Sequence, residues 1–183
     1  RLVFFREHGV KRIRLAVIGA GRLGGFHAQK AAANPSLELV AVADPVADAR
    51  NRVAAECRVQ AVDDYRKLFG RIDAAVVAAP TSLHHRIAMD LLEAGVHLLV
   101  EKPLCPTLAQ ADELVEAARR QGVVLQVGHV ERFNPAMEAV HPLVSHPKYI
   151  EAVRASGFTF RSTDVGAVLD LMIHDIDLVL DLG

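Results

Sequence analysis

The sequence predicts an α/β protein with a doubly wound parallel sheet, followed by the start of a second domain of the α+β class. Two observations support this fold class. Between Ile13 and Val130, short aliphatic runs alternate with segments of helical periodicity, which is the pattern of repeated βα units. The runs are apolar on both faces, as in strands that helices cover on each side of a parallel sheet.

The predicted elements alternate along the chain. Thr107 and Gln110 form a capping box at the start of one helix, and Gly70, Gly95 and Gly122 stand where helices are expected to stop. In chain order we expect strands at 13–19, 37–44, 72–80, 96–103 and 123–130, and helices at 22–33, 46–57, 83–94 and 107–121.

The alternation ends near Arg132. The stretch FNPAMEAV is expected to form a helix with Asn134 as its cap and Pro135 in its first turn, followed by a strand over YIEAVRAS and a polar loop, GFTFRSTDVG. A final helix is expected over residues 167–182. We therefore predict a tail at 1–11, the α/β domain at 12–132, and the beginning of a second domain at 133–183.

The composition excludes some classes of function. Of 183 residues, 51% are hydrophobic and 23% are charged, with a net charge of −1, so we expect a soluble globular protein without a general attraction to nucleic acid or membranes. The apolar run from Leu2 to Phe5 is too short for a signal peptide or a membrane span. Cys57 and Cys105 form no metal-binding or disulfide pattern, which favours a reducing, cytoplasmic location.

A glycine-rich loop follows the first predicted strand. In the pattern GxGxxG, Gly19 permits a tight turn, Gly21 lets a pyrophosphate approach the backbone, and Gly24 lets the helix pack closely. Asp44 ends the second strand twenty residues after Gly24, where a carboxylate accepts hydrogen bonds from an adenosine ribose. This combination predicts a dinucleotide-binding, Rossmann-type domain. The alternative is a plain glycine-rich turn with Asp44 as a helix cap.

The charge near the predicted ribose site indicates which dinucleotide is bound. Asp44 would repel a 2′-phosphate, which favours NAD over NADP. Arg50 and Arg52 on the following helix would favour NADP if they faced the ribose, but we interpret them as solvated surface charges. We therefore expect NAD as the cofactor.

Lys102 stands at the carboxyl end of a predicted strand, in the stretch LLVEKPLCP. Ligands of doubly wound sheets bind beyond this end of the strands, so Glu101 and Lys102 are expected to face the cofactor crevice. Pro103 fixes φ and would hold the lysine at the rim of that crevice. The alternative is a surface lysine paired with Glu101.

Asp170 and His174 are four residues apart in the last predicted helix and are expected to project from one face. A histidine with a pKa near ~6.5 can take a proton from a substrate hydroxyl at neutral pH, while a carboxylate orients the imidazole. From spacing alone, a helix that carries Asp170, His174 and Asp177 into water is equally consistent.

Four motifs occur in order along the chain, AVIGAGRLG, VVAAPTSLHH, LLVEKPL and DLMIHDIDL. With them the chain from Ile13 to Gly183 resembles the Gfo/Idh/MocA family of nicotinamide-dependent oxidoreductases. The stretch VGHVERFNPA resembles the branch of UDP-N-acetylglucosamine 3-dehydrogenases, which act on nucleotide-linked amino sugars. The resemblance implies that a hydride passes between a sugar hydroxyl carbon and NAD. It also implies catalytic roles, with Lys102 stabilising alkoxide charge, His174 acting as general acid or base, and Asp170 as its substrate-binding neighbour.

The resemblance further implies two sets of binding residues and no metal ligands. The substrate, a sugar or nucleotide sugar, would contact Arg132, Asn134, Arg161 and Asp164. Two of these have plainer alternatives, because Asn134 can cap a helix and Arg132 can pair with Glu131. The implied cofactor-binding residues are Gly19, Gly21, Arg22, Leu23, Gly24, Asp44, Pro80, Thr81, His84, Glu101 and Lys102.

Members of this family continue into a large, mostly antiparallel sheet, of which this chain would contain only the first strand and a helix. We therefore expect a truncated second domain with uncovered apolar faces, and a homo-oligomer only where that sheet is present. Two other functions compete with the dehydrogenase. One is a non-catalytic NAD(P)-binding module or inactive relic, and the other a metal-dependent enzyme using His84, His85 and His174, which no short-range ligand cluster supports.

Overall fold

The computed structural model describes residues 12–155 and 166–182. One parallel sheet of six strands has the order β3-β2-β1-β4-β5-β6. In this order β2 and β3 lie on one side of β1, and β4, β5 and β6 lie on the other, which confirms the predicted doubly wound fold. The strands are β1 (Ile13–Ile18), β2 (Leu37–Ala43), β3 (Gln60–Val62), β4 (Ala74–Val77), β5 (His97–Val100) and β6 (Leu125–Val127).

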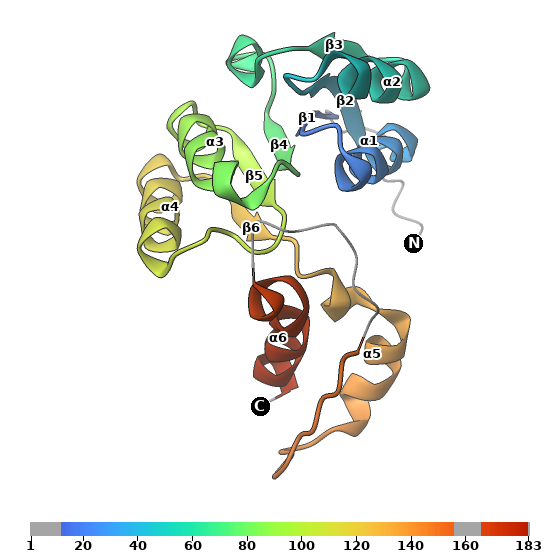
Figure 1. Cartoon of the computed structure of the whole chain (residues 1–183), viewed down its shortest axis with the longest axis vertical. Coiled ribbons are helices and arrows are strands. Elements are labelled where there is room, and N and C mark those ends of the chain that lie inside the picture. The colour runs from blue at the N-terminus through green and yellow to red at the C-terminus, as the bar shows by residue number, and fades with distance from the viewer. Residues whose placement is uncertain (1–11, 156–165, 183) are drawn as a thin grey trace, which may run out of the picture.

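Helices cover both faces of the sheet. Figure 1 shows α1 and α2 on one side and α3 and α4 on the other. The side chains of β1 alternate between two cores, with Leu15 and Val17 facing α1 and α2, and Ala16 and Ile18 facing α3 and α4. This two-sided burial explains the uninterrupted apolar runs. The bounds are α1 (Arg22–Ala33), α2 (Ala47–Cys57), α3 (Thr81–Glu93) and α4 (Leu108–Gln121).

Local capping signals predicted the helix ends well. The Thr107 hydroxyl accepts a hydrogen bond from the Gln110 amide at 3.3 Å, and α4 ends at Gly122 in the left-handed conformation. The sequence interpretation missed β3 and the 3-10 helix Tyr65–Leu68 that follows it. A three-residue strand is too short to show a periodic pattern.

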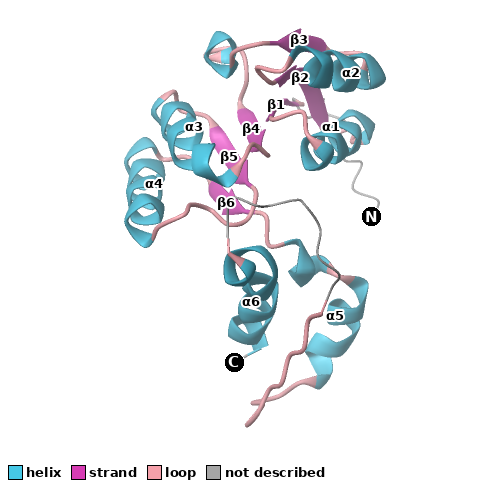
Figure 2. Cartoon of the chain, in the orientation of Figure 1, coloured by secondary structure: helices cyan, strands magenta, loops and turns pink. Residues whose placement is uncertain are grey.

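The described residues after β6 form helices and loops but no strand. Asn134 accepts a hydrogen bond from the Ala136 amide at 3.0 Å and caps α5 (Pro135–Val140), as predicted. The strand expected over YIEAVRAS is wrong for its described part, since residues 149–155 form a loop (Figure 2). Tyr149 and Val153 are 80% and 84% exposed, so these side chains find no surface on which a strand could pack.

The last predicted helix is present in two parts. A π-helical turn over Val168–Met172 leads directly into α6 (Ile173–Leu182). Helix α6 packs against the 3-10 turn Val130–Phe133, which follows β6, and lies near the carboxyl edge of the sheet (Figure 1). Residues far apart in the sequence therefore lie together near the carboxyl ends of the strands.

Candidate active site

A cavity opens at the carboxyl ends of the strands. Its walls include residues that follow each strand, from Gly19 after β1 to Gly128 after β6. The volume is about 1170 Å³, whereas pockets for single small molecules usually occupy ~300–1,000 Å³. The cavity is therefore larger than a typical site for one small molecule.

The predicted site residues separate into two groups. Those that line the cavity are Gly19, Gly21, Arg22, Leu23, Asp44, Pro80, Glu101, Lys102, Asp170 and His174. Those placed elsewhere are Gly24, Thr81, His84, Arg132 and Asn134. Arg161 and Asp164 lie outside the described residues.

The glycine loop fits a bound pyrophosphate. Gly19 has φ +101°, and a Cβ on it would lie 2.5 Å from the carbonyl oxygen of Ala78. A Cβ on Gly24 would lie 1.8 Å from the carbonyl oxygen of Gly19, so this glycine lets α1 pack on the loop. Beside Gly21 the space is open for 4 Å, and no side chain caps the amides of the first turn of α1. An anion can therefore reach those amides.

Asp44 is held firmly at the cavity wall. Its Oδ2 accepts a hydrogen bond from the Ala20 amide at 2.7 Å, and its Oδ1 accepts one from the Val46 amide at 2.8 Å. A carboxylate has about four lone-pair sites, so both oxygens can still accept ribose hydroxyls. Asp44 does not cap α2, whose N-cap residue is Val46 with no side-chain cap bond, so the alternative of a helix cap is wrong and the carboxylate remains available for a ribose.

The two arginines of α2 behave differently. Arg50 donates to the main-chain oxygens of Asp44 at 3.3 Å and Pro45 at 3.0 Å, so interpreting it as a solvated surface charge was wrong. Arg52 has a side chain that is 58% exposed and pairs with Glu56 at 3.6 Å. Neither arginine lines the cavity.

Lys102 joins the sheet to the final helical segment. Its Nζ donates to a carboxylate oxygen of Asp170 at 3.0 Å and to the main-chain oxygen of the same residue at 2.6 Å. The Lys102–Pro103 peptide is cis. The side chains of the pair are only 15% and 18% exposed, so Lys102 is not a surface lysine and Glu101 is not its side-chain partner.

Glu101 pairs instead with His27, a residue that the sequence interpretation missed. His27 Nε2 lies 2.6 Å from Glu101 Oε1. Burial acts to raise the pKa of Glu101, but the hydrogen bond and charge of His27, with a smaller contribution from Lys102, hold that pKa below its ordinary value. A Cβ on Gly128 would lie 3.1 Å from a carboxylate oxygen of Glu101, so a larger residue there would press on the carboxylate that pairs with His27. The available signal was the position of His27, one helical turn after Gly24.

His174 lies in the cavity wall with Lys102 and Asp170. Burial lowers the pKa of His174, and the positive charges of Lys102 and Arg154 lower it further. Its buried Nδ1 has no hydrogen-bond partner within the described residues. The imidazole is therefore neutral at pH 7, which is the form that accepts a proton.

Arg132 lies away from the cavity and binds α6. It donates to the two carboxylate oxygens of Asp177 at 2.7 and 2.8 Å, and to Asp181 at 2.6 Å. Asp177 is 8% exposed, and the hydrogen bonds from Arg132 hold its pKa below the ordinary value. Arg132 is thus paired within the protein, though not with Glu131, and Asp177 does not point into water. The pair ties the turn after β6 to the helix that carries His174.

The remaining predicted contact residues do not line the cavity. His84 is 1% exposed, with its ring nitrogens 2.9 Å from the Pro103 oxygen and 2.8 Å from the Ala79 oxygen, so it joins two loops under the cavity. Thr81 is buried at the first position of α3. Asn134 caps α5 and donates to Glu131 at 3.1 Å.

Within 12–155 and 166–182, no three His, Cys, Asp or Glu side chains are arranged to hold a metal ion. In the same part of the chain, no helix has the length and apolar character needed to cross a bilayer.

The sheet order, the glycine loop and the polar cluster at the strand ends define a dinucleotide-binding protein of the Rossmann class. Residues 13–129 match the GFO_IDH_MocA family model, described as an oxidoreductase family with an NAD-binding Rossmann fold. The chain belongs to this family, whose cofactor is NAD.

Several named proteins are similar to this chain. UDP-N-acetylglucosamine 3-dehydrogenase of Acidithiobacillus ferrooxidans is 41% identical over 169 residues, or 92% of this chain and 53% of that protein. A solved structure of that enzyme has a TM-score of 0.88 and covers 93% of this chain and 56% of its own. The scyllo-inositol 2-dehydrogenase (NAD(+)) of Bacillus subtilis is 32% identical, covering 91% of this chain and 53% of its own.

A structure solved with the cofactor is also similar. GenD2 from gentamicin A biosynthesis, in complex with NAD, has a TM-score of 0.82 and 29% identity, and covers 97% of this chain and 55% of its own. The chain therefore spans about half the length of the relatives it matches.

Proposed function

We propose that this protein is an NAD-dependent dehydrogenase that oxidises a hydroxyl-bearing carbon of a sugar, with nucleotide-linked sugars as its substrate class. One observation carries the proposal. Lys102, Asp170 and His174, from segments far apart in the sequence, line the same cavity as the glycine loop. The names of the relatives support a polyhydroxylated substrate, and the 41% identity to a UDP-N-acetylglucosamine 3-dehydrogenase favours a nucleotide sugar.

The first turn of α1 and Asp44 would hold NAD, through the pyrophosphate and the ribose respectively. Bound NAD would supply the acceptor for the hydride. The protein positions the catalytic lysine. The Glu101–His27 pair fixes the end of β5, and with it the backbone that carries Lys102.

The proton chemistry falls to Lys102 and His174. Lys102 uses two N–H groups on Asp170, and an ammonium has a third that can donate to the substrate oxygen. As the O–H bond breaks, a nitrogen of the neutral His174 imidazole takes the proton, and Lys102 stabilises the negative charge on oxygen. The C–H bond then breaks with its electron pair leaving as hydride, and a carbonyl group remains.

The decisive test measures kcat/KM of the Lys102→Met and His174→Ala variants of the full-length protein. Each substitution is expected to lower kcat/KM by at least ~10²-fold, the scale of losing one group that stabilises the transition state. NADH binding, followed by nicotinamide fluorescence, should stay within about threefold because the glycine loop and Asp44 are intact. Lys148→Met, at an exposed position outside the cavity, is the matched control and should leave turnover unchanged.

Substrates should be compared as matched sets. UDP-N-acetylglucosamine, free N-acetylglucosamine and scyllo-inositol present hydroxyls on similar rings with and without a nucleotide. The highest kcat/KM is expected for the nucleotide sugar. Turnover of scyllo-inositol alone would contradict the substrate class, and turnover that survives both substitutions would contradict the catalytic roles. NADH binding with no turnover of any sugar would favour a non-catalytic module.

A further inference from the structure

The adenosine end of the cavity is built from two neighbouring strands. Ala43 of β2 is in register with Val62 of β3, so Asp44 and Asp63 emerge side by side at the carboxyl edge of the sheet. The Asp44 amide donates to the Val62 oxygen at 3.0 Å, which extends the pairing by one residue. The loop after β3 therefore lies next to the residue expected to bind the ribose.

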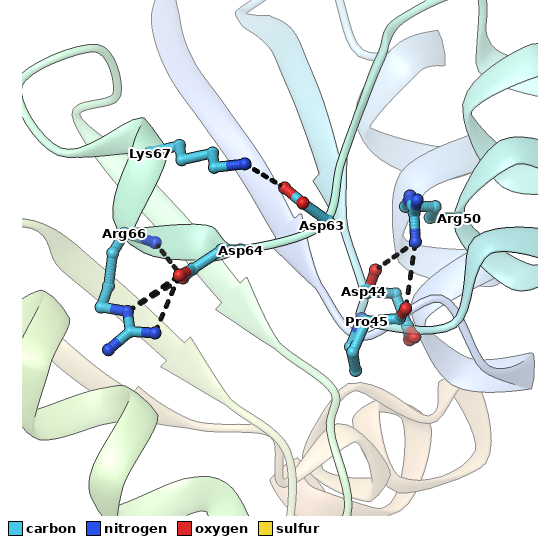
Figure 3. A network of polar contacts seen from close by, with 7 residues as sticks. All are labelled: Asp44, Pro45, Arg50, Asp63, Asp64, Arg66 and Lys67. Atoms are coloured by element: carbon cyan, nitrogen blue, oxygen red, sulfur yellow. Dashed lines mark hydrogen bonds and ion pairs between the residues drawn. The ribbon is translucent and has the colours of Figure 1, made fainter.

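Two ion pairs join the acidic residues at the start of this loop to the basic residues that follow them (Figure 3). Arg66 donates from Nη2 to Asp64 at 2.8 Å and from Nε to both carboxylate oxygens of Asp64 at 3.0 and 3.1 Å. Lys67 donates to Asp63 at 2.6 Å. Of the two cations in this loop, Arg66 lines the cavity and Lys67 does not.

The backbone fixes the Asp64–Arg66 pair in place. Asp64 Oδ1 also accepts a hydrogen bond from the Arg66 amide at 3.0 Å, because Asp64 caps the 3-10 helix Tyr65–Leu68. The Tyr65 ring centre lies 5.9 Å from the guanidinium carbon of Arg66. Hydrogen bonds from Arg66 keep the pKa of Asp64 below its ordinary value, so the carboxylate is ionised at neutral pH.

We propose that Asp64 is a second determinant of the choice of NAD over NADP, because it occupies the Arg66 guanidinium that would otherwise bind a 2′-phosphate. Asp44 acts by direct repulsion at the ribose, whereas Asp64 acts by withholding a phosphate ligand. A guanidinium binds phosphate through paired N–H groups, and Asp64 already takes one such pair of Arg66, the Nε–H and Nη2–H groups. The proposal rests on the NAD site of the family and is independent of the sugar substrate.

The test measures the Kd of NADH and NADPH for variants of this chain by nicotinamide fluorescence. Asp64→Asn removes the charge but keeps an oxygen acceptor for the Arg66 amide, so the cap is preserved. The ratio of the NADPH Kd to the NADH Kd is expected to fall about fivefold, the scale of one partly exposed ion pair. In the Asp44→Asn background the same change should lower the ratio further, because repulsion is removed and the guanidinium is released.

Two variants isolate the role of Arg66. Adding Arg66→Gln to Asp64→Asn should restore the original ratio, since the phosphate ligand is then gone. Glu113→Gln removes the same charge from an ion pair between α3 and α4, whose members lie outside the cavity wall, and should leave the ratio unchanged.

Specific outcomes overturn the proposal. It fails if Asp64→Asn shifts the ratio by less than about twofold in both backgrounds. It also fails if Arg66→Gln leaves the gain intact, because the effect would then be general electrostatics. A folded chain that binds neither dinucleotide contradicts this proposal and the proposed function together. If the Kd ratios change as expected but no sugar is turned over, only the proposed function is contradicted.

Discussion

The cofactor-binding sheet and the C-terminal segment are held together by different forces. Every buried hydrophobic side chain in the described part of the protein falls between Leu15 and Ala118. Beyond Ala118, the described residues that are buried are Gly128 and Asp177, a glycine and a charged residue. The cofactor side is thus positioned by a close-packed apolar core, and the helix that carries His174 by ion pairs.

The proposed catalytic residues therefore lie where these two regions of the protein meet. Lys102 follows β5 of the sheet, whereas Asp170 and His174 come from a segment held by ion pairs with Arg132, Arg154 and Lys102. Leu180 of α6 is 73% exposed, so its side chain contributes little to holding the helix. Binding of the dinucleotide should therefore tolerate changes in α6, whereas turnover should not.

The largest expected effect tests the core itself. Leu91→Ala, in α3 at 0% exposure, should lower the free energy of unfolding by ~3 kcal/mol, because it removes transfer free energy and leaves a cavity. The matched change Leu180→Ala should cost less than ~0.5 kcal/mol, since no packed neighbour is lost. Urea denaturation of both variants provides the measurement. Equal losses would mean that α6 has a core of its own.

A smaller effect is expected when the ion pair at α6 is broken. Asp177→Asn should speed hydrogen exchange of the α6 amides about tenfold, because charge-assisted hydrogen bonds to Arg132 are lost. Amides of β1 to β5 should exchange as before. Asp181→Asn is the control, since this more exposed partner of Arg132 should change exchange less than about threefold.

The same pair has a defined pH dependence. The folded-state pKa of Asp177 is lowered, chiefly by the hydrogen bonds from Arg132, so its stabilisation is present above the ordinary carboxylate pKa and is lost as pH falls through the lowered value. Protection of α6 should therefore fall before that of the sheet during acid titration. Simultaneous loss in both regions would contradict the separation.

The smallest effect concerns His174. Burial and then the charge of Lys102 lower its pKa, so Lys102→Met should raise that pKa while burial still keeps it below 6.5. NMR titration of the histidine ring is the measurement. Arg119→Gln, in the last turn of α4, should leave the value unchanged. In the native protein, the neutral base persists below pH 6.5, so the acid limb of kcat/KM should lie below that value.

The sequence by itself determined most helices and strands of the α/β domain and the cofactor loop. The bounds of α1 and the caps at Thr107 and Asn134 follow from local signals, since a cap bonds to amides two or three residues away. The sequence predicted the roles of Gly19 and Gly24 because a tight turn and close helix packing both exclude a Cβ. Periodicity also placed Lys102 at a strand end and His174 on a helix.

Only the tertiary structure decided which polar groups meet. As alternatives to a catalytic and a substrate-binding role, the sequence offered neighbours in the chain as partners, Glu101 for Lys102 and Glu131 for Arg132. In the structure Lys102 binds Asp170, 68 residues away, and Arg132 binds Asp177, 45 residues away. Adjacent side chains at the end of a strand tend to project to opposite sides, so the partner is set by whichever helix docks at that edge. The docking of that helix depends on contacts between residues distant in sequence, which neither residue spacing nor periodicity can predict.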